Sequence, residues 1–173
     1  MKMNYFKHMF FASFLVIMPS LLLATGETSV NDTIEKVVST KDIKRFSTKG
    51  EFIDVKEFLL QAIAGRGIKT SSTSYISKML QRTREDVGGG REIFNNAEAV
   101  GFCSATLSRQ MMESDPHHIV FCPYTIVIYE LAQQPGIIHL SYRRPFYSDT
   151  TTNDKTLKAI DDLMAGIISE VVD

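Results

Sequence analysis

The chain has 173 residues, of which 44% are hydrophobic and 23% are charged, and its formal net charge at pH 7 is −1. This length accommodates one domain with a single hydrophobic core. A net charge close to zero argues against the basic surface that nucleic-acid-binding proteins usually present, and the sequence has no polybasic patch for a membrane surface. We therefore expect no nucleic-acid partner.

Residues 1–26 have the pattern of an export signal. Two lysines form a short basic start, an apolar stretch follows over 9–23, and small residues suited to cleavage occupy 24–26. The apolar stretch has about 15 residues, whereas a membrane-spanning helix needs roughly 20. The pattern predicts cleavage, a periplasmic or secreted mature protein, and no membrane association afterwards.

The first half of the mature chain alternates between strands and helices. Asp54 and Glu57 have the spacing of a capping box, and apolar residues follow at helical intervals until Gly65. Three consecutive glycines at 88–90 predict a flexible turn. In chain order, the predicted elements are a linker leading into a first strand (27–49, with the strand near 43–46), a helix from Asp54 to Gly65, a strand (68–75) and a short helix (76–87).

The second half contains the clearest strand pair. Turn residues at 133–136 separate two apolar runs, which predicts a β-hairpin. Its second strand alternates, with Ile138, Leu140 and Tyr142 predicted on one face and the intervening polar residues on the other. The predicted elements are a strand (97–103), a helix capped by Ser104 and broken by Asp115-Pro116, an extended segment (119–121), the hairpin strands (125–131 and 137–144) and a last helix capped by Asn153 or Asp154.

The last helix carries a continuous apolar stripe, which needs an apolar surface to cover it. The inner face of the hairpin is the expected surface. The sequence therefore predicts a single α+β domain over residues 50–173, in which helices pack on one face of a mixed or antiparallel β-sheet. The residues of the stripe are Leu157, Ile160, Leu163, Met164, Ile167, Ile168 and Val171.

Three stretches carry a resemblance to a known family. They are Gly101-Phe102-Cys103-Ser104, Phe121-Cys122-Pro123-Tyr124-Thr125-Ile126 and Ser141-Tyr142-Arg143-Arg144-Pro145. Together they resemble the family labelled domain of unknown function 302, over roughly residues 50–172. The resemblance implies a compact α+β domain with a sheet flanked by helices, often found as a dimer. It implies no catalytic residues. Many members lack cysteines at the positions of Cys103 and Cys122, so the chain is similar to a cysteine-bearing branch.

Cys103 and Cys122 are the first candidate site. In an oxidising compartment two cysteines at strand ends indicate a structural disulfide, and closing the loop between them would contribute roughly 3 kcal/mol. Two alternatives stay open. The thiols can serve as a redox pair or soft metal site, although their spacing is not that of a Cys-x-x-Cys motif, or they can be unrelated buried thiols.

A metal site is a more specific hypothesis for the region around the two cysteines. His117, His118 and Met111 lie close to Cys122 in sequence, and Cys, His and Met together suit copper or haem iron. Two adjacent histidines point in different directions, so at most one is expected to face a metal. The competing interpretation is an ordinary polar turn followed by a core methionine, with no cofactor.

The polar face of the second hairpin strand is a further candidate. His139, Ser141 and Arg143 share that face, and an arginine fork matches a carboxylate or another oxyanion. A solvated sheet face or a dimer contact is the alternative. A triad of Ser141, His139 and Asp149 lacks a nucleophile elbow, so the sequence does not favour an enzyme.

The sequence thus predicts an exported, non-enzymatic domain that binds a small molecule or a partner protein and is stabilised by a Cys103–Cys122 disulfide. The alternative is a periplasmic redox or metal/haem-handling protein that uses the cysteines with His117 or His118. The expected pocket lies between the sheet and a helix. An exposed sheet edge is compatible with a homodimer. The candidate ligand-binding residues are Tyr124, His139, Tyr142 and Arg143.

Overall fold

The computed structural model describes residues 42–145 and 154–172, so the predicted export signal and most of the linker lie outside the described residues. Within these ranges no helix has both the length and the apolar composition needed to cross a membrane. The elements in chain order are β1 (Ile43–Lys49), α1 (Phe52–Gly65), β2 (Thr70–Tyr75), α2 (Ile76–Thr83), β3 (Phe94–Phe102), α3 (Ala105–Ser114), the 3₁₀ helix η1 (Pro116–Phe121), β4 (Tyr124–Leu131), β5 (Ile137–Arg143) and α4 (Lys155–Val172).

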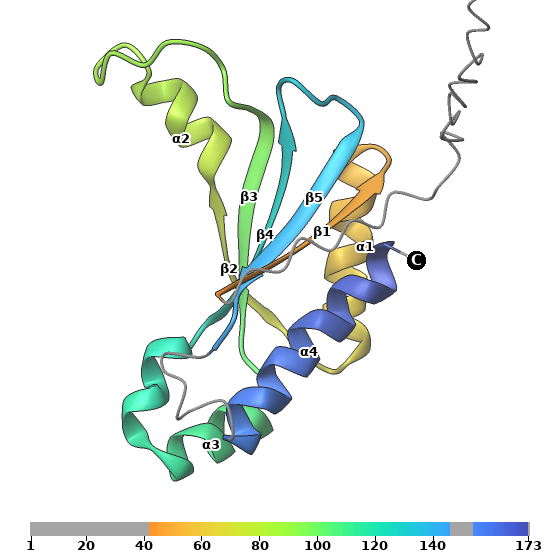
Figure 1. Ribbon diagram of the computed structural model, residues 1–173, viewed down its shortest axis with the longest axis vertical. Coiled ribbons are helices and arrows are strands. Elements are labelled where there is room, and N and C mark those ends of the chain that lie inside the picture. The colour runs from red at the N-terminus through yellow and green to blue at the C-terminus, as the bar shows by residue number, and fades with distance from the viewer. Residues whose placement is uncertain (1–41, 146–153, 173) are drawn as a thin grey trace, which may run out of the picture. The chain divides into compact units, whose positions relative to one another are not determined.

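The five strands form one antiparallel sheet in the order β1-β5-β4-β3-β2. Helices α1 and α4 lie together on one face of it (Figure 1). Arg66, just after α1, ties the two helices together by donating to the carbonyl oxygens of Ala62 and Gly166 at 2.8 and 3.0 Å. The predicted α+β architecture, with an antiparallel sheet and helices packed on one face, is confirmed.

Burial follows the alternation of the strands. Ile138, Leu140 and Tyr142 of β5 are at most 2% exposed and face the helices, whereas His139 and Arg143 point to the other face. The apolar stripe of α4 completes this core, as its spacing predicts. Strand β1 pairs with β5 along its whole length, with Phe46 buried opposite Leu140, and so belongs to the domain.

The predicted N-terminal cap is observed in one helix and not in the other. Asp154 caps α4, because its Oδ1 accepts from the backbone N–H groups of Thr156 and Leu157 at 2.8 and 3.3 Å. Helix α1, in contrast, begins at Phe52 with Glu51 as its N-cap, so the expected cap at Asp54 is wrong. Asp54 lies in the first turn instead, where a negative charge favours the helix dipole.

The expectation of extended chain at 119–121 is also wrong, because these residues complete η1. Asp115 starts that helix by accepting from the backbone N–H of His117 at 2.9 Å, and Pro116 occupies a first-turn position that needs no N–H. The same Asp-Pro pair that ends α3 therefore begins a second helix. This turn brings the chain back to the end of β3, which positions the candidate site.

Candidate functional site

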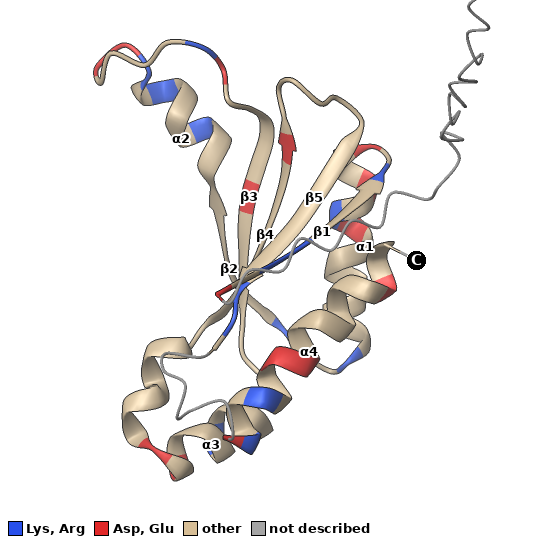
Figure 2. Ribbon diagram, in the orientation of Figure 1, with Lys and Arg blue, Asp and Glu red and all other residues tan. Residues whose placement is uncertain are grey.

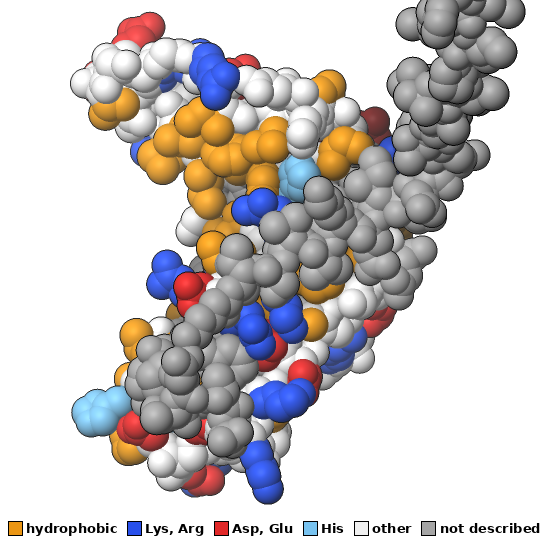
Figure 3. All heavy atoms as spheres, in the orientation of Figure 1, with side chains coloured by type: hydrophobic (Ala, Val, Ile, Leu, Met, Phe, Trp, Pro, Cys, Tyr) orange, Lys and Arg blue, Asp and Glu red, His pale blue; other side chains and the backbone are white. Residues whose placement is uncertain are grey.

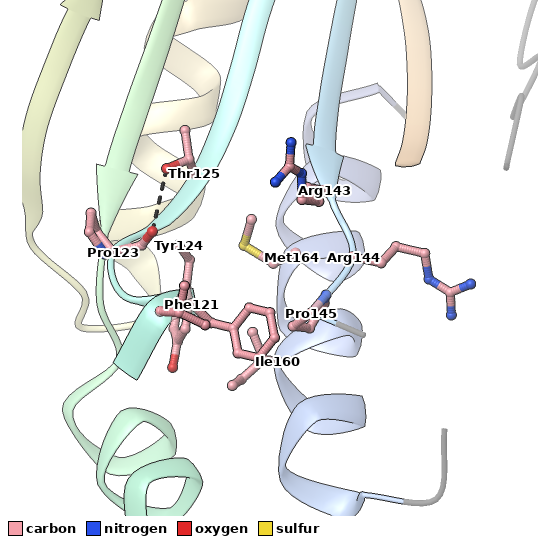
Figure 4. A pocket seen from close by; sticks show the side chains of 10 residues that line it. Phe121, Pro123, Tyr124, Thr125, Arg143, Arg144, Pro145, Ile160 and Met164 are labelled. Carbon is pink, nitrogen blue, oxygen red and sulfur yellow. Dashed lines mark hydrogen bonds between the residues drawn. The ribbon is translucent and has the colours of Figure 1, made fainter. Parts of the chain in front are cut away.

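A half-enclosed pocket of about 270 Å³ opens between η1, the start of β4, the end of β5 and α4 (Figure 4). The pairing of β4 with β5 stops at Val127 and Ser141, although both strands continue, so the strands separate above α4. Ile160 and Met164 of α4 lie beneath this gap. The residues that line the pocket are Val120, Phe121, Pro123, Tyr124, Thr125, Arg143, Arg144, Pro145, Ile160 and Met164.

The two arginines of the pocket differ in their environment. Arg144 is bound to Asp161, with its Nη2 3.1 Å from Oδ2, and its side chain points away from the apolar lining in Figure 4. Arg143 is exposed, leans toward the gap between the strands, and forms no ion pair with any described residue. Arg143 is thus the cation that an incoming ligand can reach.

Asp161 is a buried carboxylate, 3% exposed, that collects three donors. Tyr142 donates its hydroxyl to Oδ1 at 2.8 Å, Lys44 donates to Oδ2 at 3.0 Å, and Arg144 also donates to Oδ2. Burial alone would raise the pKa of Asp161, but these hydrogen bonds outweigh it and lower the pKa. We call these four residues the Asp161 cluster; its two cations exceed its one anion, so it carries net positive charge. Figure 2 shows where the basic and acidic positions lie along β1, β5 and α4.

Tyr142 is therefore a structural residue rather than an exposed ligand contact. Its ring is 2% exposed, and burial, followed by its hydrogen bond to Asp161, raises the pKa of its hydroxyl. It does not line the pocket. Tyr124, in contrast, is both buried and part of the pocket wall, and burial first of all raises its pKa to about 12, so the hydroxyl stays protonated.

Cys103 and Cys122 meet, although they are 19 positions apart. Cys103 follows β3, Cys122 follows η1, and their sulfur atoms are 2.7 Å apart; both are free thiols in the structure. Burial, and then the contact with Cys122, raises the pKa of Cys103 to about 11. A thiol with so high a pKa is a weak nucleophile and a weak metal ligand at neutral pH.

A hydroxyl group links the cysteines to the pocket. Ser108 of α3 lies 3.5 Å from the sulfur of Cys122 and 2.8 Å from the hydroxyl of Tyr124, oxygen to oxygen. We call Cys103, Cys122, Ser108 and Tyr124 the cysteine cluster. Its members come from four successive segments of the chain. It has no carboxylate, ammonium or guanidinium group, whereas the Asp161 cluster is charged.

The proposed metal ligands do not converge on the cysteines. Met111 is a fully buried core residue, and His117 is exposed. His118 is buried; its Nδ1 lies 3.4 Å from the carbonyl oxygen of Met111, and its ring nitrogens lie within 4.0 Å of Asp115 and Asp154. Among the described residues, no group of three or more His, Cys, Asp and Glu side chains is arranged to hold a metal ion.

His139 lies on the far face of the sheet, away from the pocket. Its ring stacks on Tyr129 with centroids 5.0 Å apart, its Nδ1 is 2.8 Å from the Ser47 hydroxyl, and its Nε2 is 3.2 Å from Gln134. Burial first, and then the charge of Arg45, lower its pKa. His139 and Arg143 share this face, but only Arg143 reaches the pocket.

Sequence reasoning missed three residues of this site. Asp161 has the sequence context of a charge on a helix surface. However, it lies within the apolar stripe between Ile160 and Met164, and this position could have indicated that its carboxylate is buried. Ser108 and Arg144 carried none, because their roles depend on partners that are distant in sequence.

Comparison with known proteins identifies the family. The family model described as "Domain of unknown function DUF302" matches residues 43–173. A solved structure described as an uncharacterized conserved DUF302 protein from Bacillus stearothermophilus is similar in fold, with a TM-score of 0.62 and 12% sequence identity over 76% of this chain and 99% of that one. No curated protein matches the chain. The chain, with its antiparallel sheet and two covering helices, belongs to the DUF302 family.

Proposed function

We propose that this domain binds a small amphipathic anion in the pocket between η1, β4, β5 and α4. The observation that carries the proposal is the combination of apolar walls with one available cation. Phe121, Ile160 and Met164 supply apolar surface for the body of a ligand, and Arg143 stands at the opening where a charged head would lie. Binding sites of this kind are typically apolar with a few well-placed polar groups.

The surrounding charge supports an anion rather than a cation. Arg144 and Lys44 share the single carboxylate of Asp161, so one positive charge is left over before Arg143 is counted. A guanidinium group presents parallel donors that match a carboxylate, sulfate or phosphate. A volume of about 270 Å³ is just below the usual range of roughly 300–1,000 Å³ for ligand pockets, which favours a small ligand.

The proposed setting is outside the cytosol. The signal-like pattern of residues 1–26 supports export of the mature domain, where it would act as a non-enzymatic binding or accessory protein. A second copy of the chain is compatible with this role, because β1 and β2 are the outer strands of the sheet in the described part of the chain, and an outer strand can pair with another chain.

The test compares octanoate with octanol, which share an apolar chain and differ in charge. Binding is followed by NMR chemical shifts of Tyr124, Ile160 and Met164. We expect octanoate to shift these signals and Arg143→Gln to weaken its binding about tenfold, because a charged hydrogen bond contributes about 1.5–3 kcal/mol. Octanol binding should not change in this variant.

The matched control is Arg45→Gln, which removes an exposed arginine of β1 that does not line the pocket. Octanoate affinity should be unchanged in it. If neither compound shifts the pocket signals in the unmodified protein, the proposal is wrong. If Arg143→Gln and Arg45→Gln weaken binding equally, the arginine acts only through overall charge and the proposed anchor is wrong.

A redox protein is the second candidate, and the contact between the sulfurs of Cys103 and Cys122 favours it. The raised pKa of Cys103 argues against a fast thiol-exchange catalyst. The visible spectrum and metal content of protein purified from the export compartment test the copper or haem form of this candidate. A haem band or about one copper per chain would support it.

A further inference from the structure

We propose that Cys103 and Cys122 form a reversible disulfide that sets the affinity of the pocket. The effect on affinity rests on the proposed ligand binding. The disulfide itself rests only on the positions of the two sulfurs. The cysteines are the one pair of redox-active groups in the described chain, and they lie beside the pocket rather than in it.

Cys122 occupies a particular position in the pocket wall. In the run from Val120 to Thr125, every residue except Cys122 lines the pocket. Cys122 points to the opposite side, toward Cys103. The wall residues on its C-terminal side are already held by the sheet, because Tyr124 pairs with Phe102 of β3.

The wall residues on the N-terminal side are held by side-chain packing and not by strand pairing. Val120 is 77% exposed, whereas Phe121, the last residue of η1, packs partly buried against the core with its ring centroid 5.8 Å from that of His118. The backbone N–H of Cys122 donates to the carbonyl oxygen of Ile119 within the same short helix. A bond from Cys122 to Cys103 would join the end of η1 to the end of β3 and so fix the position of Phe121 in the wall.

The local chemistry permits this bond. Disulfide sulfurs are about 2.05 Å apart, and the two thiols are already in contact at 2.7 Å, so closure needs only a small side-chain movement. Either sulfur can react first once it has lost its proton.

The oxidant is a disulfide compound, such as oxidised glutathione. One protein thiol, for example that of Cys122, loses its proton to solvent; the resulting thiolate attacks one sulfur of that disulfide, breaks its S–S bond and releases one thiolate. Cys103 then loses its proton to solvent and attacks the sulfur of Cys122, which displaces the second thiolate. The protein loses two protons and two electrons, and the external disulfide takes them up to become two thiols.

Fixing Phe121 should strengthen ligand binding, because less of the wall must be ordered when the ligand enters. We expect the disulfide form to bind octanoate at least about threefold more tightly than the dithiol form. The disulfide would also alter the surroundings of Ser108, because the Ser108 hydroxyl contacts both the sulfur of Cys122 and the hydroxyl of Tyr124.

The experiment prepares the mature protein in oxidised and reduced glutathione buffers and measures three quantities. Mass spectrometry detects the intramolecular disulfide, hydrogen exchange reports the backbone amides of Phe121 and Cys122, and NMR titration gives the octanoate affinity. In the oxidised form we expect exchange at both amides to slow at least about threefold. The amide of Gln134, in the β4–β5 turn, is the internal control and should not change.

Cys103→Ser and Cys122→Ser are the matched variants, because neither can form the intramolecular disulfide. Mass spectrometry distinguishes any mixed disulfide with glutathione by its added mass, and in neither variant should oxidation slow the exchange of Phe121 or strengthen octanoate binding. Failure of the disulfide to form in oxidised glutathione would overturn the inference. So would a disulfide that leaves the exchange of Phe121 and the octanoate affinity unchanged. If oxidation slows exchange but octanoate binds neither form, the modification site stands and the proposed ligand binding fails.

Discussion

The Asp161 cluster and the cysteine cluster flank the same pocket, and they differ in how their polar groups are stabilised. Asp161 is ionised in the interior, where hydrogen bonds from Tyr142, Lys44 and Arg144 offset the cost of burying its charge. The cysteine cluster contains no carboxylate, ammonium or guanidinium group, and burial raises the pKa of Cys103 and of Tyr124. One side of the pocket thus has a fixed charge, because hydrogen bonds hold Asp161 ionised. The other side can change chemically only by oxidation of its two sulfurs.

The largest expected effect comes from breaking the charged side. Asp161→Asn leaves Lys44 and Arg144 without their shared carboxylate, and removing one partner of a buried ion pair costs about 3 kcal/mol or more. We expect this loss in the free energy of unfolding, measured by urea denaturation. Asp162→Asn is the control, because Asp162 is exposed and pairs with Lys158 on the surface, where a pair contributes about 0.5 kcal/mol. Equal losses in the two variants would contradict the role given to Asp161.

A smaller effect is expected on the side of the cysteine cluster. Tyr124→Phe removes the hydroxyl that is hydrogen-bonded to Ser108, which should lower the free energy of unfolding by about 1 kcal/mol. The cost stays moderate because Ser108 keeps its contact with Cys122. Tyr129→Phe, on the other face of the sheet, is the comparison variant and should change stability less. A loss as large as that of Asp161→Asn would mean that the two clusters do not differ as proposed.

The smallest effect is a pH dependence that lies outside both clusters. The pKa of His139 is lowered in the folded chain, first by burial and then by Arg45, so the unfolded chain binds a proton at a higher pH than the folded chain does. Stability contributed by neutral His139 is therefore present above the ordinary His pKa of about 6.5 and is lost as pH falls toward the lowered folded value.

Urea denaturation at a series of pH values should show this decline, and His139→Gln should make it shallower. The control is His117→Gln, which replaces an exposed histidine. If both variants leave the same slope, or if His117→Gln flattens it more, the environment assigned to His139 is wrong.

Much of the fold could be predicted because its signals are local. The alternation in β5, the turn at 133–136 and the stripe of α4 each follow from neighbouring residues, and together they specify a sheet covered by helices. The errors occurred at element ends. Asp54 and the segment 119–121 were misassigned because two polar residues compete for one helix start, and because Asp-Pro both ends a helix and begins another.

The candidate site was predictable only in part. The expected ligand pocket between the sheet and a helix, near Cys103, Cys122 and Tyr124, stays a prediction. Tyr124 and Arg143 line the pocket described above, and the two cysteines lie beside it. Tyr142 and His139 were assigned to ligand binding from their strand, but one is buried against Asp161 and the other lies on the opposite face. Strand alternation tells which residues share a face, but it does not tell which end of that face a helix leaves open.

The sequence by itself determined the α+β class, the hairpin and the covering helix, because these depend on hydrophobic periodicity and turn residues within short windows. Only the tertiary structure decided that Cys103 and Cys122 touch, that Asp161 is buried with three donors, and that Arg144 is bound to Asp161 while Arg143 leans toward the gap between the strands. Each of these contacts joins residues from separate elements. Their distances depend on how η1, the strand ends and α4 pack together, which no local pattern encodes.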